Sequence, residues 1–178
     1  MKQLILIVAA IAALTLNTSA QSVRKLAAAT AAEYGANYEV EIEYTDLIAA
    51  GASSSNLNLT IFPLGTQFRS NQVVKSLMTR VDVPFQSSGD TNLNGFVTMS
   101  VGDVGSTTRF MGAIAVASNN AVDVWLTNNL SYRYSTPSNI IARFSASGAA
   151  GANGGTLSNL TGGRLRIYLE TVNPNDLP

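Results

Sequence analysis

The stretch that decides the fold is YEVEIEY, residues 38–44, in which apolar and acidic side chains alternate strictly. Successive side chains of a β-strand point to opposite faces of its sheet, so this alternation predicts a half-buried antiparallel strand. Glu39, Glu41 and Glu43 then share one face. We expect this row of glutamates to be solvated rather than to form a catalytic carboxylate site.

Further strand-like runs follow toward the C-terminus, separated by turn residues such as Pro63, Gly65 and the SSGD segment at 87–90. They cover residues 57–62, 72–85, 96–101, 122–126, 130–134, 140–145 and 164–170. Short strands at this spacing, without a long amphipathic helix, predict an all-β fold. We therefore expect an antiparallel β-sandwich or jelly roll over residues 38–173, followed by a short tail at 174–178.

The N-terminal part of the chain has a different composition. Lys2 precedes an apolar run over residues 4–16, and small residues at 18–20 resemble a cleavage site before Gln21. Residues 1–20 are therefore either a secretory signal or a structural arm, and the run is too short for a stable membrane span, which needs about 20 apolar residues. The Ala-rich residues 21–37 predict a short helix or an extended arm.

Composition excludes several chemistries. The chain has 178 residues, with neither histidine nor cysteine. Disulfides, thiolate nucleophiles, Ser-His-Asp triads and zinc sites built on imidazole or thiolate are therefore absent. Eleven Lys and Arg balance eleven Asp and Glu, and the basic residues are scattered, which argues against a nucleic-acid partner.

Charged residues make up only 12% of the chain, against about 25% in an average globular protein. A surface so poor in charge must be rich in Ser, Thr, Asn and Gly. Such surfaces are typical of proteins whose exterior meets other subunits, and of secreted β-proteins.

Two loops resemble ligand sites. Asp90, Asn92 and Asn94 before Gly95 match the opening of a calcium loop, but Val101 stands where a bidentate carboxylate is needed, so we interpret the segment as a hairpin turn. The glycine-rich residues 148–155 lack the following Lys-Ser/Thr of a phosphate loop. We expect no cofactor. A carboxylate glycosidase remains a minor alternative, since no acid lies in a recognisable pair motif.

Five segments together resemble small tailed-phage virion structural proteins. They are VDVPF at 81–85, VTMSVGD at 97–103, TTRFM at 107–111, IIARF at 140–144 and GRLRIYL at 163–169. The resemblance spans roughly residues 38–172. It implies a β-sandwich or jelly roll that decorates or cements a capsid, or forms the base of a head fibre, and it supplies no catalytic residues.

The resemblance leads us to expect a non-enzymatic virion protein that contacts other virion subunits and forms homo-oligomers. Asp103 and Arg109 flank a short loop and are expected to pair there. Trp125, Tyr132 and Tyr134 are candidate interface aromatics, with ordinary core positions as the alternative. The alternative function is a secreted or periplasmic β-sandwich that binds a surface or polysaccharide, if residues 1–20 are cleaved.

Overall fold

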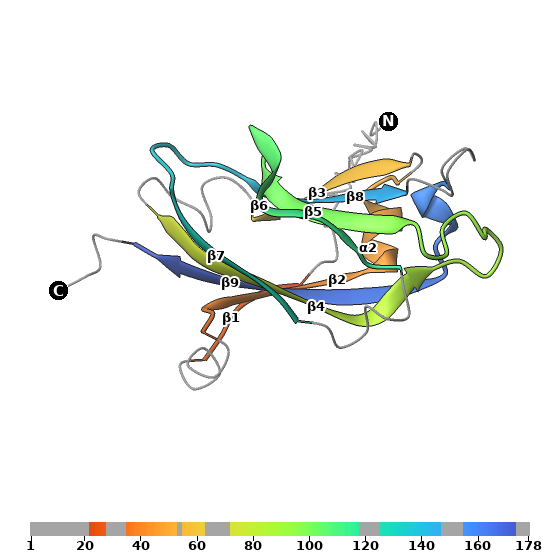
Figure 1. The fold of residues 1–178 in the computed structure, drawn as a ribbon, viewed down its shortest axis with the longest axis horizontal. Coiled ribbons are helices and arrows are strands. Elements are labelled where there is room, and N and C mark those ends of the chain that lie inside the picture. Colours follow the sequence, from red (N-terminus) through yellow and green to blue (C-terminus); the bar gives the residue numbers. More distant parts are fainter. Residues whose placement is uncertain are drawn as a thin grey trace, which may run out of the picture.

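The protein is a sandwich of two antiparallel β-sheets (Figure 1), which confirms the predicted all-β class. The computed structural model describes residues 22–27, 35–52, 55–62, 72–117, 125–146 and 155–173. The first sheet has the order β1 (Ser22–Lys25), β2 (Tyr38–Glu43), β9 (Gly162–Val172), β4 (Val73–Gln86) and β7 (Trp125–Arg133). The second has the order β3 (Asn56–Phe62), β8 (Ile140–Ala146), β5 (Val97–Asp103) and β6 (Ser106–Ala115). A short helix α2 (Tyr44–Ala49) follows β2, and a 3-10 turn η2 (Leu157–Asn159) precedes β9.

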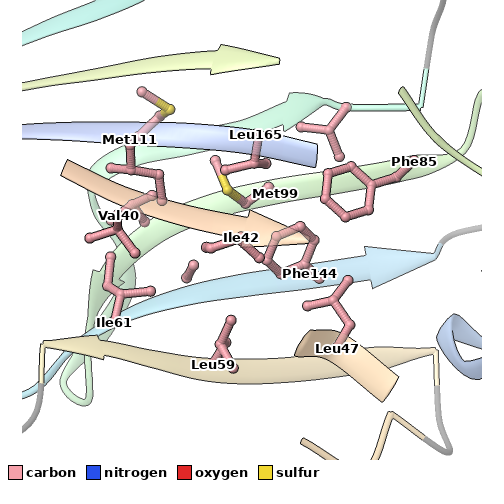
Figure 2. Close-up of a cluster of buried hydrophobic side chains, with 14 of the residues drawn as sticks. Val40, Ile42, Leu47, Leu59, Ile61, Phe85, Met99, Met111, Phe144 and Leu165 are labelled. Carbon is pink, nitrogen blue, oxygen red and sulfur yellow. The ribbon is translucent and has the colours of Figure 1, made fainter. Parts of the chain in front are cut away.

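The core lies between the two sheets and is built by the alternation seen in the sequence. Val40 and Ile42 of β2 are fully buried, as expected for the apolar face of that strand. Figure 2 shows them facing side chains from the second sheet, including Ile61 and Phe144. Phe85 and Phe144 pack with ring centroids 5.4 Å apart, so the end of β4 contacts β8 across the sandwich.

The glutamate face of β2 differs from its prediction as a solvated row. The side chain of Glu39 is only 6% exposed, because Arg24 approaches it to 2.7 Å and Arg166 to 3.8 Å. Arg166 also lies 3.0 Å from Glu41. The strand alone does not reveal this burial: β1 and β9 flank β2 and bring arginines into register with its glutamates.

The same face of the first sheet carries a second buried acid. Asp82 of β4 is 8% exposed at its side chain and lies 3.3 Å from Arg80, 3.5 Å from Arg166 and 3.7 Å from Arg164. In a chain with few charges, these ion pairs gather on one sheet face. They pair the strands by charge as well as by backbone hydrogen bonds.

The folded sheet begins before the boundary predicted at residue 38. Ser22–Lys25 forms strand β1 rather than a helix, and the Leu26 N–H continues the pairing by donating to the Asn37 carbonyl at 2.9 Å. Leu26 packs with Ala36 and Tyr168 in a small apolar cluster. The predicted segments 1–20 and 174–178 lie outside the described residues, and no helix within the described ranges is long and apolar enough to cross a membrane.

Candidate interaction site at the β5–β6 hairpin

The hairpin between β5 and β6 is held by one aspartate. Asp103 is the last residue of β5 and pairs with Ser106, the first of β6, which leaves Val104 and Gly105 as the turn. Asp103 Oδ1 accepts hydrogen bonds from the Gly105 N–H at 2.9 Å and the Ser106 N–H at 2.8 Å. An aspartate that bonds the backbone two and three residues later fixes the turn locally.

The other oxygen of Asp103 ties the turn to the rest of the molecule. Its Oδ2 accepts hydrogen bonds from Arg109 Nε at 2.5 Å and from the Tyr134 hydroxyl at 2.9 Å. The Asp103 side chain is only 4% exposed. Asp103 and Arg109, which the sequence places on either side of the short loop, thus form an ion pair whose acid is buried and whose base is 29% exposed.

Aromatic rings surround this ion pair. The Arg109 guanidinium carbon lies 4.4 Å from the Tyr132 ring centroid, a cation–π contact. Tyr132 and Tyr134 pack edge-to-face at 5.1 Å, and Phe110 contacts both rings at 6.0 and 6.2 Å. The sequence did not single out Phe110 as a site residue, and β6 has no strict alternation that would predict its burial, since Phe110 and Met111 are both buried.

The candidate interface aromatics have different positions. Tyr134 is buried and Tyr132 is partly buried, so in the single chain both support the hairpin from within. The backbone of Trp125 in β7 pairs with Arg80 of β4, but the Trp125 side chain lies outside the described part of the structure. Their predicted role at a subunit interface stays a prediction.

Burial and hydrogen bonding set the protonation of the cluster. Burial acts to raise the pKa of Asp103, but hydrogen bonds from Arg109, Ser106 and Tyr134 outweigh it and bring that pKa below its ordinary value. Burial, with the Asp103 carboxylate beside it, raises the pKa of the Tyr134 hydroxyl. Asp103 is therefore a carboxylate whose oxygens are occupied by donors, which suits bracing rather than proton transfer.

The braced turn presents one apolar side chain to solvent. Val104 is 75% exposed, the largest exposure among the large apolar residues in the described ranges. Gly102 lies behind the turn, where an added Cβ would clash with the Ser106 carbonyl oxygen and with Thr107. The backbone at Gly102 therefore lies in close contact with the start of β6, directly behind the turn that exposes Val104.

The candidate calcium residues form a hydrogen-bonded turn. Asp90 Oδ1 accepts from the Asn92 N–H at 3.1 Å, and Asp90 Oδ2 accepts from Asn159 Nδ2 at 3.1 Å. Asn94 bonds the backbone N–H and carbonyl of Ser87, at 2.9 and 3.0 Å. No three acidic side chains of the described residues gather as a metal site. The segment is a hydrogen-bonded turn, but the prediction of a hairpin was wrong: it joins β4 of the first sheet to β5 of the second, and these two strands lie in different sheets.

Comparison with solved structures gives two matches. A chain of the cyanophage Pam1 capsid asymmetric unit matches with a TM-score of 0.48 and 19% identity, covering 85% of this chain and 84% of that one. A chain of infectious bursal disease virus, Gx strain, matches with a TM-score of 0.26 and 12% identity, covering 89% of this chain and 33% of that one. No protein-family model and no curated protein matches. At these identities the comparisons assign no function to the chain.

Proposed function

We propose that the chain is a non-enzymatic structural component of a virus particle, of the capsid decoration or cement type, that acts through protein–protein contacts. The observation that carries the proposal is the β5–β6 turn, where buried Asp103 holds exposed Val104 in place. A side chain held in its binding conformation loses little entropy on association. A rigid apolar tip is therefore suited to adhesion between subunits.

The segments that resemble virion proteins support the proposal by their position. They lie in β4, β5, β6, β8 and β9, so they come from both sheets and form much of the framework. The low share of charged residues adds to this, because interface cores are depleted of charge.

The arrangement of the acids favours a structural role over catalysis. Asp103 is occupied by four donors, and Glu39, Glu41 and Asp82 lie beside arginines. A general base or nucleophile needs an accessible lone pair directed at a substrate. These carboxylates instead hold strands and a turn together.

The experiment that tests the proposal is intact mass spectrometry of the native protein. Purified particles are analysed beside particle-free culture medium. We expect a mass near 18.7 kDa in the particles, with residues 1–20 retained as an arm. A protein found only in the medium and lacking residues 1–20 would overturn the proposal in favour of the secreted binding module.

A further inference from the structure

The turn that joins the two sheets contains an asparagine followed by a glycine. Asn94 and Gly95 lie near the end of the segment that runs from β4 of the first sheet to β5 of the second (Figure 1). Asn94 is exposed, whereas its neighbour Leu93 is fully buried in the core. Leu93 therefore anchors the turn, and the Asn94 carboxamide lies at the surface, within reach of water.

An asparagine in this position can react with its own backbone. The Gly95 nitrogen attacks the side-chain carbon Cγ of Asn94, the bond between Cγ and Nδ2 breaks, and ammonia leaves with the proton of the Gly95 N–H. Water then opens the cyclic imide at either of its two carbonyls, which gives aspartate or isoaspartate. Glycine favours the ring closure because it has no side chain to shield its nitrogen and its backbone adopts many conformations.

The folded turn directs the Asn94 carboxamide away from this reaction. Its Oδ1 accepts a hydrogen bond from the Ser87 N–H at 2.9 Å, and its Nδ2 donates to the Ser87 carbonyl at 3.0 Å. Both ends of the carboxamide are thus bonded to the backbone at the start of the turn. Ring closure has to rotate the carboxamide toward the Gly95 nitrogen, and the two bonds oppose that rotation.

The backbone of the dipeptide is restrained as well. The Phe96 N–H donates to the Leu93 carbonyl at 3.2 Å, so Asn94 and Gly95 are the two central residues of a β-turn. Gly95 has a φ of 88°, a conformation that glycine adopts without strain. The peptide bond between Asn94 and Gly95 has to turn before the ring can close, and the β-turn holds it in place.

A second anchor fixes the turn from outside the reacting dipeptide. Asp90 Oδ1 accepts from the Asn92 N–H at 3.1 Å, and Asp90 Oδ2 accepts from Asn159 Nδ2 of η2 at 3.1 Å. These bonds hold the turn without involving the Asn94 carboxamide. Removing them would loosen the turn and leave the chemistry of the dipeptide unchanged.

The products of the reaction no longer fit the turn. Aspartate has an oxygen where Nδ2 donated, so a negative charge with no proton to give would face the Ser87 carbonyl oxygen. Isoaspartate adds a carbon to the main chain inside the turn that the bond between Leu93 and Phe96 closes. Both changes favour the open turn over the closed one.

We propose that Asn94 is a latent deamidation site, which the folded turn protects and which reacts when the turn opens. Modification then accumulates in chains whose turn has opened. Because ammonia is lost, refolding does not reverse it. This inference is independent of the proposed function.

Peptide mapping by mass spectrometry measures the rate of deamidation at Asn94 in the purified protein at neutral pH. A synthetic peptide of residues 90–97 in the same buffer is the reference, because it has the same dipeptide without the bonds to Ser87. Since the turn has to open first, we expect the rate in the folded chain to be roughly tenfold or more below that in the peptide. Equal rates would overturn the inference.

A variant that loosens the turn tests the source of the protection. Asp90→Ala should raise the rate at Asn94 roughly threefold or more, because it removes both bonds of the second anchor. Glu170→Ala is the matched control, since it removes an acid that pairs with Lys75 elsewhere on the molecule, and we expect the wild-type rate. Circular dichroism checks that both variants fold. An unchanged rate in Asp90→Ala, or equal acceleration in both variants, would show that the turn is not what protects Asn94.

The Asn94→Asp variant tests the effect of the product on the fold. It loses the bond to the Ser87 carbonyl, so we expect its melting temperature to fall by about 2–4 °C. Thr91→Asp is the control, because it adds the same charge to an exposed position of the same turn and keeps both bonds between Asn94 and Ser87. An Asn94→Asp chain as stable as Thr91→Asp would contradict the claim that modification favours the open turn.

Discussion

Arg109 Nε lies 2.5 Å from Asp103 Oδ2, while the guanidinium of the same residue covers the Tyr132 ring at 4.4 Å. Asp103 and Arg109 belong to β5 and β6 of the second sheet, whereas Tyr132 belongs to β7 of the first. One cation therefore joins the hairpin to the opposite sheet. The stability of the turn is coupled in this way to the stability of the sandwich.

Replacing Asp103 with alanine should destabilise the protein strongly. The substitution removes the acceptor of four hydrogen bonds and leaves Arg109 without its partner. A hydrogen bond to a charged group contributes about 1.5–3 kcal/mol, and Arg109 stays 29% exposed to water, so we expect a loss of about 3 kcal/mol of unfolding free energy. Chemical denaturation followed by circular dichroism measures this loss.

The matched control for that substitution is Glu170→Ala. Glu170 pairs with Lys75 at 2.9 Å and accepts a hydrogen bond from Ser76 Oγ at 3.1 Å, but its side chain is 32% exposed, so the expected loss is only about 1 kcal/mol. Equal losses in the two variants would contradict the bracing role of Asp103.

Removing the Tyr134 hydroxyl should have a smaller effect. Tyr134→Phe keeps the ring packing on Tyr132 and Phe110 but takes one donor from Asp103. A hydrogen bond to a charged group contributes about 1.5–3 kcal/mol, and we expect the unfolding free energy to fall by this amount. Chemical denaturation measures the change. If Tyr134→Phe were as stable as the wild type, the hydroxyl would have no part in holding Asp103.

The sequence was sufficient for the all-β class and for part of the site, but the predicted runs left out β6 and divided β7 into two strands. Alternation over residues 38–44 correctly assigned Val40 and Ile42 to the core, because period two is a local property of a strand. The burial of Glu39 was missed, since the covering residue Arg166 is far away in the chain. The same limit applies to Tyr134, whose bond to Asp103 depends on how the two sheets face each other.

Stability should depend on pH through the same cluster. The pKa of Asp103 is lowered in the folded state, so its contribution is present above about pH 4 and lost as the pH falls through the folded value. The difference in unfolding free energy between wild type and Asp103→Ala should therefore narrow in acid. Burial raises the pKa of Asp46, so this residue makes the protein more stable as the pH falls. The effect is the same in wild type and in Asp103→Ala, and it therefore cancels in the difference between their unfolding free energies.

The contribution of Tyr134 to stability should be lost at high pH, whereas that of Asp103 is lost at low pH. The pKa of Tyr134 is raised by burial, so its contribution is present below about pH 10 and lost as the pH rises through the folded value. The stability difference between wild type and Tyr134→Phe should narrow only in strong alkali. Denaturation midpoints across the pH range measure both effects, and a difference constant with pH would contradict them.

A methyl group at Gly102 should disturb the turn. Its Cβ would clash with the carbonyl oxygen of Ser106, a residue whose backbone is fixed by its pairing with Asp103. Overpacking of this kind costs about 1–3 kcal/mol, so we expect Gly102→Ala to lower the melting temperature. Gly112→Ala in β6 is the control, because a Cβ there meets nothing within 4 Å and should leave the melting temperature nearly unchanged.

The turn at residues 87–95 should be stabilised by Asn94 and not by calcium. Asn94→Ala removes two hydrogen bonds to the backbone of Ser87, with an expected loss of about 1–3 kcal/mol. Asn92→Ala is the control, since Asn92 gives its backbone N–H to Asp90 and alanine keeps that donor. Melting temperatures in excess calcium chloride and in a chelator should agree for each variant. Calcium stabilisation of the wild type that disappears in Asn94→Ala would instead establish the segment as an ion site, because a ligand raises stability only where it binds the folded state.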